Sequence, residues 1–165
     1  MTDDLSKFVD LAKELGADDA KIIDTRTIKT AAWVRMKCLY GCRYRRFHCC
    51  PPNTPTPKET QEIIDCYKVA LLIHGNNSDP SNIVLKIERE IFLSGYYKAI
   101  GFGCGPCTLC KTCNPEKCVH PKEARPSMEA CGIDVYATVK ENGFPIAVVQ
   151  DKKCNGNYYG LVLIE

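Results

Sequence analysis

Twelve cysteines in 165 residues constrain this chain more than any other feature, because most of them fall into two groups. The dense group consists of Cys104, Cys107, Cys110, Cys113 and Cys118. The loose group consists of Cys38, Cys42, Cys49 and Cys50. The other three, Cys66, Cys131 and Cys154, stand alone. Thiols repeated at two-residue spacing converge on one point, which indicates that something is bound there.

Composition limits the kinds of protein this can be. Apolar residues make up 45% and charged residues 25%, which is ordinary for a globular chain with its own core. A net charge of +2 predicts no strong attraction to nucleic acid or to an anionic membrane. We find no secretory signal and no membrane-spanning run, so we expect a cytoplasmic protein. Reduced thiols in that compartment bind metal more often than they form disulfides.

The pattern of apolar residues predicts one α/β domain over residues 1–165, a mixed sheet with packed helices. Helices are expected at 3–15, 57–66, 80–95 and 134–142, and strands at 20–24, 69–73, 99–102, 145–149 and 158–164. Thr56 to Glu59 has the form of a capping box. Asn155-Gly156 is a hairpin signal between the last two strands. Residues 31–37 fit either a strand or a helix, and segments 38–52 and 104–131 are expected to be cysteine-rich iron–sulfur loops.

The dense group favours an iron–sulfur cluster. Cys107-x2-Cys110-x2-Cys113 is the spacing with which bacterial-type ferredoxins hold a [4Fe–4S] cluster. A single zinc ion, the alternative, usually takes two separated C-x2-C pairs. Cys118 follows after a gap of four residues rather than three. Cys104 is open between a ligand role and a buried free thiol.

The loose group supplies fewer ligands. Cys38 and Cys42 lie one helical turn apart, and we expect Cys50, held by two prolines, to be a ligand in preference to Cys49, because adjacent side chains diverge. Cys131 is the natural fourth thiol, although Cys118 and Cys131 could exchange sites, as fourth cysteines do in two-cluster ferredoxins. Alternatively the fourth position is open, which would make the protein an enzyme. Cys66 and Cys154 are expected to be incidental thiols.

Three segments resemble a family of uncharacterised predicted metal-binding proteins of anaerobic bacteria and archaea, methanogens included. They are residues 37–42 with 50–52, residues 105–110, and residues 118–134, the last containing Arg-Pro-Ser-Met-Glu-Ala-Cys-Gly-Ile-Asp. The resemblance covers nearly the whole chain. It implies that the metal ligands are Cys38, Cys42, Cys50, Cys107, Cys110, Cys113, Cys118 and Cys131. It does not supply an activity.

The leading hypothesis is therefore an iron–sulfur protein with two [4Fe–4S] clusters, one for each cysteine group. It would carry electrons to or from a larger redox enzyme or an electron-transfer protein, or serve as an accessory subunit in anaerobic metabolism. Basic residues beside both groups, such as Arg43, Arg45 and Lys111, would stabilise anionic clusters and suit an acidic redox partner. The alternatives are an enzyme with an open-coordination cluster and a zinc-stabilised interaction module.

Overall fold

The computed structural model describes residues 5–76 and 79–165, and it confirms the predicted α/β class. The α-helices are α1 (Ser6–Glu14), α2 (Ala32–Gly41), α3 (Pro57–Ile64), α4 (Pro80–Leu93) and α5 (Val135–Glu141). Two short 3-10 helices are η1 (Thr25–Thr27) and η2 (Glu129–Cys131). The strands are β1 (Asp19–Asp24), β2 (Val69–Gly75), β3 (Ile100–Phe102) and β4 (Tyr158–Leu163). The start predicted for the first helix lies outside the described residues.

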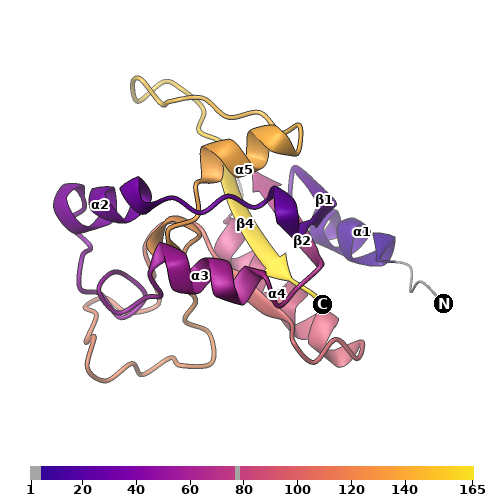
Figure 1. The fold of residues 1–165 in the computed structure, drawn as a ribbon, viewed down its shortest axis with the longest axis horizontal. Coiled ribbons are helices and arrows are strands. Elements are labelled where there is room, and N and C mark those ends of the chain that lie inside the picture. The colour runs from indigo at the N-terminus through magenta and orange to yellow at the C-terminus, as the bar shows by residue number, and fades with distance from the viewer. Residues whose placement is uncertain (1–4, 77–78) are drawn as a thin grey trace.

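The strands form one sheet in the order β1-β2-β4-β3, and each neighbouring pair is antiparallel. β2 and β4 occupy the centre, and their side chains are almost completely buried. A cluster containing Phe8 and Ile87 packs α1 and α4 on one face. A second cluster containing Ile64, Met128 and Val139 packs α3, η2 and α5 on the other face. The helices therefore cover both faces of the sheet (Figure 1).

Local capping signals in the sequence identify two helix starts. The Thr56 hydroxyl accepts the Glu59 N–H, and the Glu59 carboxylate accepts the Thr56 N–H at 2.7 Å, which confirms the capping box of α3. Asp134 caps α5 by accepting the Ala137 N–H at 3.0 Å. The ambiguous segment after residue 31 is helical and forms α2.

The strand predicted at residues 145–149 is wrong, and so is the hairpin predicted at residues 155–156. Both edges of β4 are already paired, one with β2 and the other with β3. No edge of β4 is left for the preceding segment, which runs as an irregular connection with Val148 and Val149 exposed. The order of the strands therefore overrides a local preference for strand and turn.

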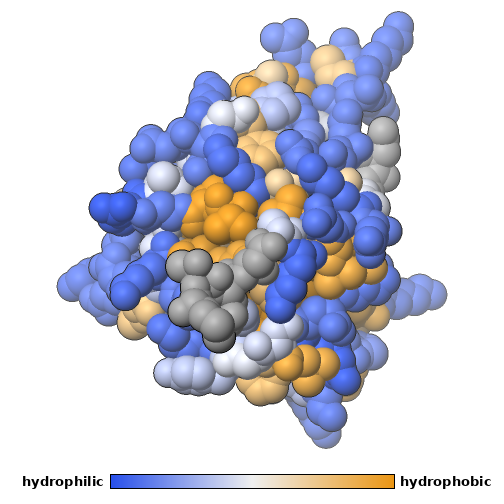
Figure 2. All heavy atoms as spheres, turned by 90° about the vertical axis from the view of Figure 1, so that its right-hand side faces the viewer, coloured by the Kyte–Doolittle hydropathy of each residue, from blue (hydrophilic) through white to orange (hydrophobic). Residues whose placement is uncertain are grey.

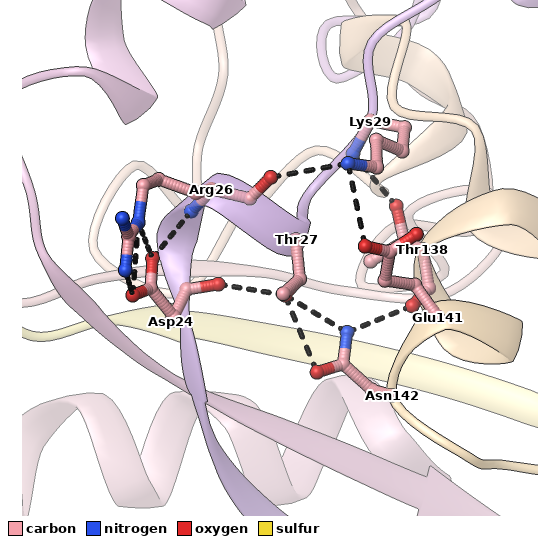
Figure 3. Close-up of polar contacts among 7 residues, drawn as sticks. All are labelled: Asp24, Arg26, Thr27, Lys29, Thr138, Glu141 and Asn142. Carbon is pink, nitrogen blue, oxygen red and sulfur yellow. Dashed lines mark hydrogen bonds and ion pairs between the residues drawn. The ribbon is translucent and has the colours of Figure 1, made fainter.

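A polar network fixes the segment after β1 against α5 (Figure 3). The Lys29 N–H donates to the Thr138 hydroxyl at 3.0 Å, and the Asn142 amide donates to Thr27 Oγ1 at 2.9 Å. Asp24 forms an ion pair with Arg26 at the start of this segment. These contacts hold the backbone that leads directly into α2.

The surface on the α1 side is mainly hydrophilic, with a smaller apolar area among the charged side chains (Figure 2). In the part of the chain that the structure describes, no helix has both the length and the apolar character needed to cross a membrane.

Candidate metal centre

The two cysteine-rich segments lie side by side at the end of the molecule opposite α1. In Figure 1 they occupy the left side, where the turn after α2 faces the irregular segment 104–126. A single cavity is lined by His48 and Cys49 from the turn and by cysteines of the dense group. The fold therefore brings together thiols that are about sixty residues apart in the sequence.

α2 positions the first two thiols of the loose group. Cys38 lies in its last turns, and Cys42 is its C-terminal cap residue. The Tyr44 N–H donates to Cys42 Sγ at 3.4 Å. Cys50 returns to this pair and is buried. Burial, and then the neighbouring thiols of Cys42 and Cys38, raise the pKa of Cys50 to about 11.

A hydrogen-bonded turn carries Cys49 and Cys50. The Arg46 N–H donates to the Pro51 carbonyl at 2.8 Å, and the Cys50 N–H donates to the Phe47 carbonyl at 3.0 Å. The Asn53 amide closes the turn by donating to the carbonyls of Arg46 and Phe47. These hydrogen bonds join the residues on both sides of the two adjacent thiols into one turn.

Four cysteines of the dense group line a cavity of about 90 Å³, and Cys49 of the loose group lines it as well. The four are Cys107, Cys110, Cys113 and Cys118. The His48 N–H donates to Cys113 Sγ at 3.4 Å, which joins the turn to the dense group. Backbone N–H groups directed at sulfur stabilise negative charge on a thiolate, so this bond suits a metal ligand.

Cys49, the weaker ligand candidate in the sequence, lines the cavity of the dense group. Burial, and then the thiols of Cys107 and Cys118, raise its pKa to about 12, so Cys49 faces the dense group. Its neighbour Cys50 faces Cys42 and Cys38. The two adjacent side chains diverge as expected, but the divergence directs them toward different groups. Two consecutive cysteines before Pro51 are the sequence signal for this arrangement, and the structure shows that both are buried.

Cys131 lies in η2 and is fully buried. The Thr60 hydroxyl donates to the Cys131 carbonyl at 2.6 Å, which ties η2 to α3. Burial raises the pKa of Cys131 to about 12, and the nearby thiols of Cys49, Cys38 and Cys50 add to this rise. The structure therefore brings Cys131 to three thiols of the loose group, Cys49, Cys38 and Cys50.

The remaining cysteines lie outside the thiol-lined cavity of the dense group. Cys104 is held by Ser81, whose hydroxyl accepts the Cys104 N–H at 2.9 Å, and burial raises the pKa of Cys104 to about 12. Cys66 and Cys154 are exposed, and Cys66 Sγ donates to the Glu62 carbonyl at 3.4 Å.

The donor atoms restrict which metals this site can take. Sulfur ligands suit zinc or iron–sulfur clusters, whereas magnesium and calcium require oxygen. Metal must displace the protons of these thiols, so binding would release protons. Within residues 5–76 and 79–165, no three or more His, Cys, Asp or Glu side chains are already arranged around a point for a single metal ion.

An α/β scaffold that gathers buried thiols from separate segments defines a cysteine-rich metal-binding protein. The chain belongs to the family of predicted metal-binding proteins, whose model matches residues 21–164. This confirms the resemblance found in the sequence. No curated protein and no solved structure matches the chain.

Proposed function

We propose that this protein holds two [4Fe–4S] clusters and passes single electrons to or from a larger redox enzyme. The observation that carries the proposal is the cavity lined by five cysteines from two segments, with a backbone N–H on one of the sulfurs. Such clusters accept ligands from several directions and supply one-electron chemistry when bound.

The dense group would supply one ligand set. The ferredoxin spacing assigns Cys107, Cys110 and Cys113 to it. Cys118 is the fourth ligand expected from the sequence, and Cys49 lines the same cavity as a fifth candidate. A cluster with four protein ligands needs only one of these two thiols.

The loose group would supply the second set, with Cys38, Cys42, Cys50 and Cys131 as ligands. Cys42 and Cys38 are the thiols that most raise the pKa of Cys50, which supports this set. Cys131 lies near Cys49 as well as near Cys38 and Cys50, because all three thiols raise its pKa. Because Cys131 lies near Cys38 and Cys50, it can supply a fourth thiolate. This favours a cluster with four cysteine ligands over a cluster with one iron position open for a substrate.

An acidic partner fits the surface around the two groups. The side chains of Arg43, Arg45, Arg46, Lys111 and Lys117 are exposed on the turn and on the segment that faces it. Complementary charge steers association and sets orientation, which is what a transient electron-transfer complex requires.

Metal analysis after anaerobic purification tests the proposal. Two [4Fe–4S] clusters predict about eight iron and eight sulfide per chain and a broad visible absorption. A colourless protein that contains zinc and no sulfide would refute the proposal and would support a zinc-stabilised interaction module.

Serine variants test the ligand sets. Cys131→Ser should lower iron to about half, because one of two clusters loses a ligand. The exposed Cys66→Ser is the matched control and should leave iron unchanged. Unchanged iron in Cys131→Ser would instead favour the enzyme with an open cluster. Comparing Cys49→Ser with Cys118→Ser shows which thiol completes the dense set.

A further inference from the structure

A second cavity adjoins the loose group and is much larger than the cavity of the dense group. It has a volume of about 410 Å³, which lies within the range of small-molecule sites. Its walls come from α2, from the start of α5, from the irregular segment 146–149 and from the start of β4. Figure 1 shows α2 at the left and the segment that follows α5 at the top.

The walls of this cavity are mainly apolar. Val34, Ile133 and Val135 are buried contributors, and the aromatic rings of Trp33 and Tyr158 are about half exposed at its opening. An apolar lining with few polar groups is typical of sites for small organic molecules.

Glu129 places one polar group in this lining. Its Oε2 atom is buried and has no hydrogen-bond partner among the described residues. The other acidic side chain of the lining, Asp134, already accepts the Ala137 N–H. Burial raises the pKa of the Glu129 carboxyl group even though the Glu129 N–H and the Ser127 hydroxyl donate to it, and Oε2 itself has no such partner. A buried polar oxygen without a partner is costly, so Oε2 calls for a further donor.

Thiols complete the wall beside Glu129. Cys38 and Cys42 line the cavity, as does Cys104, and Cys38 Sγ lies 3.8 Å from the Glu129 carbonyl oxygen. A molecule in this cavity would therefore lie next to the loose group on one side and next to a carboxyl group on the other.

We propose that this cavity binds a small, uncharged, mainly apolar molecule whose single N–H or O–H group donates to Glu129 Oε2. An uncharged molecule suits the mainly apolar lining of the cavity. The site goes beyond the proposed electron transfer, since Glu129 and the apolar residues of the lining are not metal ligands.

Phenol and anisole form a matched pair of probes, because they differ in one O–H group. The anaerobically purified, metal-loaded protein is dialysed to equilibrium against both probes together, and the bound amounts are measured. We expect phenol to bind about tenfold more tightly, as one hydrogen bond to a buried carboxylate predicts. Equal binding, or tighter binding of the more apolar anisole, would overturn the proposal.

Two variants separate the role of Glu129 from that of the cavity. Glu129→Met keeps the length and apolar contacts of the side chain, so it should abolish the preference for phenol while anisole still binds. Ala147→Trp fills the opening and should reduce binding of both probes, whereas Val148→Trp, outside the lining, should change neither. If Glu129→Met still prefers phenol to anisole, Glu129 is not the acceptor and the proposal is wrong.

The outcome is independent of the metal analysis. If the protein contains zinc and prefers phenol, the two-cluster proposal is refuted and the proposed binding site is supported. If the protein contains iron–sulfur clusters and shows no preference for phenol, the binding site is refuted and the two-cluster proposal is supported.

Discussion

Gly132 is the backbone position on which the geometry beside Cys131 depends. It ends η2 with φ +78°, a conformation that side-chain-bearing residues rarely adopt. An added Cβ would lie 2.4 Å from Pro57 Cγ and 2.9 Å from Pro57 Cα. The Gly132 carbonyl also accepts the Ala31 N–H at 2.9 Å, at the start of α2. One residue thus joins η2, α3 and α2.

Gly132→Ala should therefore destabilise the protein through two separate effects. The left-handed conformation costs about 1–2 kcal/mol for alanine. Contact with the Pro57 ring and backbone adds about 1–3 kcal/mol, because the proline at the start of α3 cannot rotate away. We expect the free energy of unfolding to fall by about 2–5 kcal/mol, the sum of these effects.

Gly143→Ala is the matched control. Gly143 has a similar φ of +83°, but an added Cβ would meet nothing within 4 Å. The free energy of unfolding of Gly143→Ala should therefore fall only by the cost of the left-handed conformation, about 1–2 kcal/mol. Urea denaturation, followed by circular dichroism on anaerobically prepared proteins, measures both losses. Equal losses in the two variants would refute the contact with Pro57.

The metal content supplies a second readout. In Gly132→Ala, the close contact between the new Cβ and Pro57 can be relieved only by a displacement of η2 or α3. Because η2 contains Cys131, such a displacement would move this thiol. Gly132→Ala is expected to bind less metal than the wild type, whereas Gly143→Ala should retain its full content.

Three further predictions test other parts of the structure. Thr138→Val leaves the Lys29 N–H without its acceptor and should lower the free energy of unfolding by about 1–3 kcal/mol in urea denaturation. The hydrogen bonds and charge of Arg26 lower the pKa of Asp24 from 3.8 to about 2, so the ion pair stabilises the fold above pH 3.8 and this contribution is lost as the pH falls toward 2. In Arg26→Gln, an NMR titration should show the Asp24 pKa returning toward 3.8. Removal of the metal with a chelator should increase hydrogen exchange in segment 104–126 and leave β2 protected, because β2 is paired on both sides within the core.

The elements that the sequence predicts well are those set by local chemistry. The Thr56 cap of α3 and the Asp134 cap of α5 depend on residues three positions apart, so the sequence alone contains the signal. The failure at 145–149 has a different cause. Whether an apolar segment becomes a strand depends on a free sheet edge, and strand order is decided by distant parts of the chain.

The difference between local and long-range determinants also explains which parts of the candidate site the sequence predicts. Spacing within residues 107–113 indicates how thiols converge inside one segment. It says nothing about which other segment faces them. Cys49 shares a cavity with Cys107 and Cys118 only because the turn after α2 packs on the dense group. The unpartnered Oε2 atom of Glu129 is equally invisible in the sequence, because its lack of a donor depends on every neighbouring element.

The adjacent pair Cys49 and Cys50 gives the two thiol groups a common structural element. Cys49 lines the cavity of the dense group, whereas Cys42 and Cys38 are the thiols that most raise the pKa of Cys50. One hydrogen-bonded turn closed by Asn53 holds both residues. Metal bound by one group would fix this turn, so the second group would bind without losing that backbone entropy again. We therefore expect cooperative loading. Native mass spectrometry of partly reconstituted protein should show empty and fully loaded chains in excess of half-loaded ones, and a dominant half-loaded species would mean that the turn does not couple the groups.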